Sequence, residues 1–564
     1  MKLILDGCPV EAAPGRSLLD LVRDNSLDDP RLSRRPVAAR IAGETYTLNY
    51  VPNRSDTATR AAMEASGGEV HLIRFPEPRA RRAYERTALF VLHLAIFRRF
   101  PEAVAKTNYA VGSAMNVTVE KTPAFTPEDL EALRREFRAL VAADIPLIRT
   151  RLTTAQAAEQ FAKIGQDDKA RLLRWRKTPY FDVYRYGDFQ EYFYGEMAPS
   201  TGYLTVWDMV YADGGLMFLY PDPQDPDRPC AYRERPNFIA AFREAERWCT
   251  LMNCAVAADL NDLVSSGHIR ELIRVNEALH EKRFSEIADR IVDRGAQAVF
   301  LAGPSSSGKT TSANRLSVQL RVHGKRPIPI SLDDYYEDRD KVPAGPDGKV
   351  DLEHINTIQV ARFRRDLSAL LRGETVELPR FDFITQRSSP SGRFVTLGPD
   401  SVLVVEGLHG LNPAILPEDL DPERIFRVYV SALFPLNLDN HNRIATTYLR
   451  LLRRIVRDNA TRGYSVENTL DIWDSVRRGE ERWIFPYQEN ADVIFNSSLV
   501  YELAVLKKHI YPLLTAVGPE NPHYEEVRSI VKILNYIEEA DVDDEVPPTS
   551  ILREFIGGNT FYKK

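Results

Sequence analysis

The sequence predicts an α/β protein whose C-terminal part is built on a parallel β-sheet, preceded by two units of mixed strands and helices. A glycine-rich turn, Gly303-Pro-Ser-Ser-Ser-Gly308, joins a buried strand over Ala298–Ala302 to a helix that runs from Lys309 toward His323. Beyond this turn, short apolar strands alternate with helices, which is typical of a parallel sheet covered on both faces. The first 235 residues instead begin with a hairpin, a helix and further strands.

Composition and charge narrow the class of protein. Of the 564 residues, 44% are hydrophobic and 27% are charged, which is ordinary for a globular chain of three or four domains. A net charge of −6 gives no general attraction to nucleic acid or to anionic membranes. The longest apolar run, 88–97, is half a membrane span, and the stretch 1–7 breaks too early for a secretory signal. The four cysteines fit no metal or disulfide spacing, so we expect a cytoplasmic protein with no membrane partner.

The glycine-rich turn fits the phosphate-binding pattern G-x-x-x-x-G-K-[ST] in full. Gly303 and Gly308 would let the backbone close tightly around an anion, with the positive end of the following helix adding to the field. We therefore expect ATP and Mg²⁺ here, with Lys309 on the β- and γ-phosphates and the Thr310 hydroxyl on the metal. The nucleotide-binding residues expected are Gly303, Ser305, Ser306, Ser307, Gly308, Lys309, Thr310 and Thr311. The alternative, a Gly/Ser loop that binds nothing, does not account for the full pattern between a strand and a helix.

Acidic residues lie near the ends of two of the later strands, which we expect over 326–332, 401–408, 425–431 and 492–496. Ligands of such sheets bind beyond the carboxyl ends of the strands. Asp333 follows the strand over 326–332, where a carboxylate could accept a proton from an acceptor hydroxyl. Glu406 ends an apolar run and could hold Mg²⁺ through water. Taken alone, each carboxylate could equally be an ordinary residue at a strand end.

The sequence from the phosphate loop to Asp333-Asp334-Tyr335-Tyr336 resembles that of uridine kinases and their phosphoribulokinase relatives. The resemblance implies that Asp333 is the catalytic base, with Asp334 as the second choice. The stretch 349–354 resembles the segment that holds the ribose hydroxyls, which implies a substrate contact through Asp351. The stretch 378–387 resembles the base-binding loop, which implies contacts through Phe381, Phe383 and Gln386. Tyr and His of the family have become Phe381 and Gln386, so the base specificity is open.

The stretch 450–463 is similar to the arginine-rich lid of the same family, R-x-x-R-D-x-x-x-R-G. The resemblance implies that Arg454 and Arg457 stabilise charge on the transferred phosphate, that Arg454 also contacts substrate, and that Arg462 contacts the nucleotide. A basic helix face is more often simply solvated. The lid pattern in the same chain as the phosphate loop favours the functional interpretation.

The front of the chain resembles threonyl-tRNA synthetases. Residues 1–75 are similar in element order to their small ubiquitin-like (TGS) domain, and the run 183–204 is similar to part of their editing domain. The Cys and His of that editing site fall on Phe193 and Met197, and the two histidines of its earlier helix fall on Arg86 and Phe90. The resemblance therefore implies an editing fold without its metal ligands.

The domains expected are a TGS-like β-grasp domain (1–75), an editing-like domain (76–235), a helical connector (236–294), a P-loop uridine kinase-like domain (295–515) and a C-terminal helix and tail (516–564). Residues 541–550 read as an acidic, proline-containing linker. The predicted function is an ATP-dependent nucleoside kinase acting on a uridine- or cytidine-like ribonucleoside, in a homo-oligomer. The alternative is a nucleotide-gated regulatory protein whose front binds tRNA or another RNA.

Overall fold

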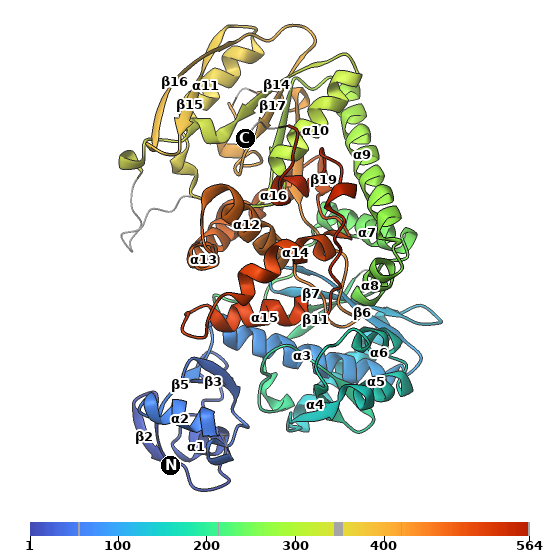
Figure 1. Cartoon of the computed structure of the whole chain (residues 1–564), viewed down its shortest axis with the longest axis vertical. Coiled ribbons are helices and arrows are strands. Elements are labelled where there is room, and N and C mark those ends of the chain that lie inside the picture. Colours follow the sequence, from blue (N-terminus) through green and yellow to red (C-terminus); the bar gives the residue numbers. More distant parts are fainter. Residues whose placement is uncertain (55–56, 213, 343–352, 419, 562–564) are drawn as a thin grey trace.

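The structure, a computed structural model, describes residues 1–54, 57–212, 214–342, 353–418 and 420–561. We call residues 1–235 the front half and residues 295–515 the P-loop half. In Figure 1 the sheet of the P-loop half lies at one end of the molecule and the N-terminal strands lie at the other. Among the described residues, no helix combines the length and the apolar character needed to cross a membrane.

The chain begins with a five-stranded sheet in the order β2-β1-β5-β3-β4. β1 and β5 are parallel, and the other neighbours are antiparallel. Ser17 and Asp20 exchange side-chain-to-backbone hydrogen bonds, and helix α1 begins directly after this cap at Leu18. Helix α2 is not predicted, because Ser, Asp and Gly residues around it are typical of loops. The elements are β1 (Lys2–Leu5), β2 (Cys8–Glu11), α1 (Leu18–Asp24), β3 (Ala38–Ile41), β4 (Glu44–Thr47), α2 (Thr57–Ala65) and β5 (Glu69–Ile73).

The rest of the front half packs around the long helix α3 (Pro78–Arg99). A four-stranded antiparallel sheet, β11-β12-β7-β6, and a three-stranded sheet, β10-β9-β8, share a core with this helix. The strands are β6 (Val104–Val111), β7 (Ala114–Glu120), β8 (Arg149–Thr153), β9 (Tyr180–Tyr186), β10 (Phe189–Glu191), β11 (Asp208–Ala212) and β12 (Gly215–Leu219). The helices are α4 (Pro127–Ala142), α5 (Thr154–Lys163) and α6 (Asp167–Leu173).

Three helices connect the halves: α7 (Pro236–Leu251), α8 (Ala257–Ser265) and α9 (Ile269–Arg294). Helix α9 runs along the side of the P-loop half (Figure 1) and ends where Gly295 adopts a φ of 69°. Glu277 and Glu281 of α9 pair with Arg315 of α10 at 3.3 and 2.8 Å. The connector therefore packs directly on the helix that follows the glycine-rich loop.

The P-loop half holds a five-stranded parallel sheet in the order β14-β17-β13-β18-β19. The strands are β13 (Ala298–Ala302), β14 (Arg326–Ser331), β17 (Ser401–Glu406), β18 (Ile425–Ser431) and β19 (Val493–Asn496). The antiparallel hairpin β15 (Val376–Asp382) and β16 (Arg387–Val395) stands beside the sheet. The helices are α10 (Lys309–Val322), α11 (Val360–Leu371), α12 (Thr446–Arg462), α13 (Val466–Trp483) and α14 (Glu502–Thr515).

Two of the predicted strands end earlier than expected, and the reason lies at the site. Ser331 pairs with Glu406 as the last register position of β14 and β17. A short 3₁₀ turn, Leu332–Tyr335, follows at once. A Cβ on Gly407 would lie 2.5 Å from the Cβ of Leu332, so both chains turn away together at the carboxyl edge.

The C-terminal segment corrects an expectation from the sequence. Beyond α15 (Tyr524–Leu534) and the short α16 (Arg553–Ile556), the stretch 541–550 is not a loose linker. Val546, Ser550 and Leu552 are at most 1% exposed, and Arg553 donates to the carbonyl of Val546 at 2.8 Å. Sparse apolar residues among acidic ones hide this packing in the sequence. We call residues 541–557 the C-terminal strap.

The loop between β18 and α12, residues 432–445, ties the halves together. The N–H of Thr107 in β6 donates to the carbonyl of Asn440 at 2.7 Å, and the Asn437 amide donates to the carbonyl of Thr107 at 3.0 Å. The front half is therefore joined to the segment that leads directly into α12.

Candidate active site

The glycine-rich loop leaves no room for a side chain at either of its two glycines. A Cβ on Gly303 would lie 2.0 Å from the carbonyl oxygen of Val430 on β18. Gly308 has a φ of +83°, in the left-handed region, and a Cβ there would meet Ile551 at 2.5 Å. The loop thus folds tightly against the sheet and presents the first turn of α10, whose N–H groups have no partners within the helix. Such a turn is a cradle for phosphate.

The serines of the loop differ in their contacts. The N–H of Ser305 donates to Glu480 at 3.0 Å, and its hydroxyl accepts from Arg454 at 2.7 Å. Ser306 and Ser307 are buried, and in the described structure their hydroxyls make no hydrogen bond. These two hydroxyl groups are therefore available to hydrogen-bond a ligand.

Lys309 lies among carboxyl groups at the carboxyl edge of the sheet. Its ammonium group donates to the carbonyl of Pro304 at 3.1 Å. Burial lowers the pKa of Lys309, while Glu406 and Asp333 act to raise it. The lysine is thus held near both acidic residues that the sequence analysis selects.

The two adjacent aspartates face different partners. Asp333 accepts a hydrogen bond from the Tyr336 hydroxyl, and burial raises its pKa against the opposing effect of Lys309. Asp334 instead accepts from the backbone N–H of Phe381. Only Asp333 therefore shares the electrostatic environment of the glycine-rich loop, whereas Asp334 holds the hairpin in place.

The donors expected for Mg²⁺ are oxygen atoms, as this metal prefers. Thr310 lies exposed at the start of α10, and Glu406 accepts from the Ser331 hydroxyl at 3.1 Å. Burial and the charge of Asp333 raise the pKa of Glu406 to about 7. Burial and Glu480 raise the pKa of Glu353 to about 7 as well. Lys309 and the nearby Arg454 and Arg462 do not bring these carboxyl groups back to their ordinary pKa values, so the residues present fit a divalent cation.

The arginines of α12 make three kinds of contact. Arg450 and Arg453 are buried and make paired contacts with Glu480 and Glu502. Arg454 reaches the loop at Ser305, as noted above. Two further arginines, Arg457 and Arg462, pair with the buried Asp458 at 2.9 and 3.4 Å. The helix is therefore an ordered wall over the loop and not merely a solvated basic face.

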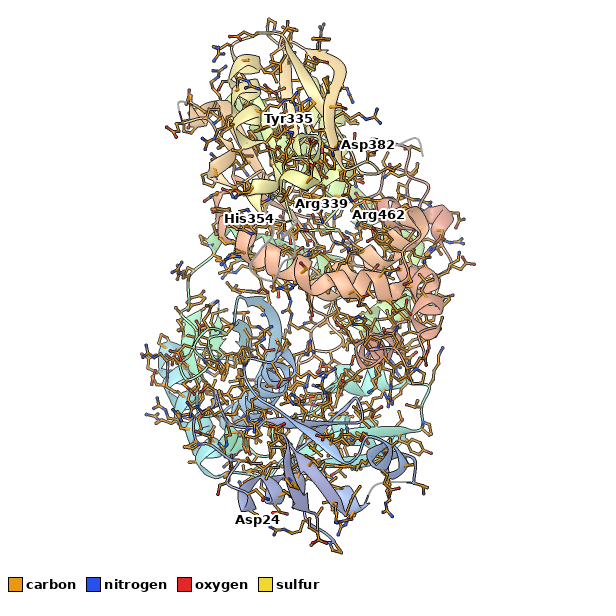
Figure 2. The ribbon with its side chains drawn as sticks, turned by 90° about the vertical axis from the view of Figure 1, so that its left-hand side faces the viewer. Asp24, Tyr335, Arg339, His354, Asp382 and Arg462 are labelled. Atoms are coloured by element: carbon orange, nitrogen blue, oxygen red, sulfur yellow. The ribbon has the colours of Figure 1, made fainter. Side chains whose placement is uncertain are left out.

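Aromatic rings lie beside the candidate base. Tyr336 packs edge-on against Phe381 and Phe383, with ring centroids 5.5 and 6.3 Å away. Gln386 lies exposed in the turn of the hairpin with a φ of 57°. Asp351, the expected ribose contact, lies outside the described residues. Figure 2 shows Tyr335, Arg339, His354, Asp382 and Arg462 together in the P-loop half, away from Asp24 of the front half.

Two carboxylates at this site are not predicted from the sequence. Glu353 follows the expected ribose segment by two positions, so the resemblance points to its neighbourhood but not to its role. Glu554 of α16 accepts from the Thr311 hydroxyl at 2.7 Å and from the Thr311 N–H at 3.4 Å. Thr311 and Glu554 are 243 positions apart, so no local sequence pattern could have linked them.

The four expected editing positions come together in the front half, but they carry no ligand chemistry. Arg86 donates to the carbonyl of Glu196 at 2.7 Å, and burial lowers its pKa to about 10. Phe90 and Met197 are buried in the same apolar core, against which Phe193 packs. Among the residues that the structure describes, no group of three or more His, Cys, Asp or Glu could hold a metal.

A parallel sheet of this strand order, with a phosphate-cradling loop and carboxylates at its edge, defines a P-loop phosphotransferase. The chain belongs to the phosphoribulokinase/uridine kinase family, whose family model matches residues 299–503. The uridine kinase of Proteus mirabilis is 30% identical over 200 residues, which cover 84% of that enzyme and 35% of this chain. The uridine kinase of Halobacterium salinarum is 29% identical over 198 residues, or 78% of its length.

The front half is similar to a second group. The threonine–tRNA ligase of Syntrophomonas wolfei is 28% identical over 200 residues, which cover 35% of this chain and only 29% of the ligase. Among solved structures, a possible uridine kinase from Bacillus stearothermophilus is 22% identical and covers 38% of this chain and 97% of its own, with a TM-score of 0.26. The family assignment rests on the sequence relatives. The chain thus joins a kinase domain to a ligase-like front half.

Proposed function

We propose that this protein is an ATP-dependent nucleoside kinase, which transfers the γ-phosphate to the 5′-hydroxyl of a ribonucleoside. The observation that carries this proposal is the position of Asp333. Its carboxyl group lies in the charge environment of Lys309, at the carboxyl edge of the sheet and beside an aromatic cluster. A nucleotide switch has no need of such a base, whereas a kinase for an alcohol acceptor does.

The chemistry follows from the groups present. The N–H groups of the loop and Lys309 hold the phosphates of ATP. Asp333 accepts the proton of the 5′-hydroxyl while the oxygen of that hydroxyl bonds to the γ-phosphorus. At the same time the bond between the γ-phosphorus and the β,γ-bridging oxygen breaks, and ADP leaves. Arg454, which already contacts Ser305, lies close enough to the loop to stabilise the charge that develops on the phosphoryl oxygens. Thr310 and Glu406 would hold Mg²⁺, which would supply positive charge to offset that of the phosphates.

The choice of nucleoside rests on the hairpin residues. Phe381 and Phe383 offer flat apolar faces to a base, and Gln386 has an amide that donates or accepts. The family's Tyr hydroxyl is absent at Phe381, and one lost buried hydrogen bond weakens discrimination by about 0.5–1.5 kcal/mol. We therefore expect a kinase that accepts pyrimidine ribonucleosides but separates them from other bases poorly.

A panel of ribonucleosides and ATP tests this proposal on the purified full-length chain. The expected product is the nucleoside 5′-monophosphate, with uridine and cytidine accepted and purines turned over at comparable rates. Strong selectivity for the two pyrimidines would contradict the expected loss of discrimination. Absence of nucleoside-stimulated ADP release with every member would contradict the kinase itself.

The second candidate is a nucleotide-gated protein whose front half binds tRNA. The observation that favours it is the hydrogen-bonded join between β6 and the loop that leads into α12. RNA affinity that changes with bound nucleotide, without any nucleoside turnover, would support this alternative. A homo-oligomer remains a prediction from the sequence, and sedimentation would test it.

A further inference from the structure

A cavity of about 580 Å³ lies between the front half and the P-loop half. Its wall includes Tyr220 and the tip of the β6–β7 hairpin on one side, and Pro304, Arg443 and the first turn of α12 on the other. The catalytic candidates Lys309, Asp333 and Glu406 are not part of this wall. The cavity is therefore separate from the proposed active site, although Pro304 places it directly behind the glycine-rich loop.

One end of the cavity has polar groups without partners. In the described part of the chain, the guanidinium of Arg443 makes no hydrogen bond or ion pair; burial lowers its pKa to about 10, against the weaker opposing effects of Tyr220 and Glu85. The hydroxyl of Tyr220 is buried and has no hydrogen-bond partner within the described structure. Helix α12 begins after Ala445 with no side-chain cap, and Thr446 and Thr447 of its first turn line the same space. An unpaired guanidinium, an orphaned hydroxyl and an open helix N-terminus together favour an anion.

Three other arginines of the wall pair with carboxylates. Arg450 and Arg477 both pair with Glu480, and Arg81 pairs with Glu85 at 3.5 Å. Arg235 instead donates to the carbonyl of Phe485 at 3.0 Å. Within the described residues, the wall's arginines without an ion pair are therefore Arg235 and Arg443, and Arg443 is the one whose charge acts on Tyr220.

The wall also carries aromatic rings. Tyr109 packs against Phe242 and Phe238 with centroid distances of 4.9 and 6.0 Å. Flat rings of this kind stack on the faces of nucleobases. We propose that this cavity binds a nucleoside monophosphate, with the phosphate at Arg443 and Tyr220 and the base toward the aromatic rings. Arg450, which lines the cavity, also donates to the carbonyl of Ser305 at 3.0 Å, so the bound ligand would lie one side chain from the glycine-rich loop.

Equilibrium titration of the full-length chain with uridine 5′-monophosphate, in the absence of ATP, tests this site. We expect Arg443→Gln to weaken binding by about tenfold or more, since a charge-assisted hydrogen bond is lost. Tyr220→Phe keeps the ring and should weaken binding several-fold. Arg478→Gln, an exposed arginine of α13 outside the wall, should leave it unchanged. Orthophosphate should compete.

Unchanged affinity in both Arg443→Gln and Tyr220→Phe would overturn the proposal. Binding that is lost in Lys309→Ala but kept in Arg443→Gln would place the ligand at the glycine-rich loop and would overturn it as well. Tyr220→Phe remains informative should Arg443→Gln fail to fold. None of these outcomes depends on nucleoside turnover.

An independent observation concerns the C-terminal strap and the glycine-rich loop. Thr311 lies in the first turn of α10, where backbone N–H groups of this motif receive nucleotide phosphates. Both its hydroxyl and its N–H donate to the carboxylate of Glu554. Ile551 of the strap packs on Gly308, and Phe555 lies 5.0 Å from the guanidinium carbon of Arg453. The strap therefore meets the loop on its nucleotide-facing side.

The strap is anchored by buried apolar side chains, whereas the residue that contacts Thr311 is only half-buried. Ile551, Leu552 and Phe555 are buried, whereas Glu554 is half-exposed on the single turn of α16. We infer that Glu554 competes with the phosphates of ATP for Thr311 and must swing aside when a nucleotide binds. This inference rests on the proposed function only in taking the loop as the nucleotide site.

Titration of the full-length chain with ADP tests this competition. Glu554→Gln keeps the shape of the side chain but removes its charge, so we expect ADP to bind about tenfold more tightly. Glu545→Gln is the matched control, because it removes a strap carboxylate that pairs with Arg270 and Arg274 instead. Equal or weaker ADP binding in Glu554→Gln, or no binding in either protein, would overturn the inference. Tighter ADP binding without nucleoside turnover would uphold it while the kinase proposal failed.

Discussion

At the scale of residues, the candidate active site holds more carboxyl groups than its cations offset. Asp333, Glu353 and Glu406 all have raised pKa values, and burial is the first cause in each case. Lys309 is the cation that acts against all three. Such a cluster is costly to a resting protein, and it becomes useful only when a cation and a phosphate group enter together.

The aspartate pair gives a sharp test. Asp333→Asn should lower kcat by about 10²–10⁴-fold, because the amide has the same shape but cannot take the proton. Nucleotide affinity should stay nearly unchanged. Asp334→Asn is the control, since that carboxylate receives the Phe381 N–H and should affect turnover far less. The reverse pattern in kinetic measurements would assign the base to Asp334.

The front half gives a second prediction at this scale. Arg86, Phe90, Phe193 and Met197 provide neither imidazole nor thiolate where the ligase-like editing site would need them. We expect no stoichiometric zinc in the full-length chain and no hydrolysis of mischarged Ser-tRNA. Elemental analysis of protein purified without chelators tests this expectation, and a content of one zinc per chain would contradict it.

At the scale of elements, α12 combines support and chemistry on one helix. Arg453 is fully buried against Glu502, whereas Arg454 one position later reaches the glycine-rich loop. Neighbouring residues on a helix point 100° apart, so one face can anchor the helix while the next serves the site.

Substitution at these two positions should separate the roles. Arg453→Met leaves Glu502 buried without its partner and should lower the free energy of unfolding by about 3–5 kcal/mol. Arg454→Gln should instead lower kcat by about 10²–10³-fold, with little change in thermal stability. Denaturation curves and kinetics on both variants check this, and a stability loss confined to Arg454→Gln would contradict it.

Local rules explain which elements are predictable from the sequence. The Ser17 cap, the end of α9 before Gly295 and the turn at Gly303–Gly308 each depend on a few adjacent residues. The same is true of Asp333, in the turn that follows β14, and of Glu406, the last residue of β17. The packing of the strap and the contact of Glu554 with Thr311 are not predictable from the sequence. Both depend on α9, α14 and α10, which lie far away along the chain.

At the scale of the whole molecule, a buried polar network joins the two halves. Lys169 of α6 lies 3.3 Å from Glu191 and 3.5 Å from Asp439, and all three are at most 1% exposed. Burial alone would lower the pKa of Lys169, but the two carboxylates raise it above its ordinary value. His441, beside Asp439, stacks on His93 of α3 at 3.7 Å. The halves are therefore expected to unfold as one unit.

Lys169→Met tests this join. Removing the ammonium leaves buried carboxylates unpaired and should lower the free energy of unfolding by about 3–5 kcal/mol in a single transition. Lys163→Met is the control, because its pair with Glu159 is exposed to solvent and contributes little to stability. Two separate thermal transitions, with the P-loop half unaffected, would contradict the coupling.

The central claim is that the γ-phosphate of ATP passes to a nucleoside at the site of Lys309 and Asp333. The most direct measurement follows γ-labelled ATP with uridine in the wild-type chain and in Lys309→Ala, with folding checked by circular dichroism. We expect label on the 5′-oxygen of the nucleoside, and a fall of at least about 10²–10³-fold in the folded variant. Label that never reaches the nucleoside, or full activity in folded Lys309→Ala, would contradict the claim.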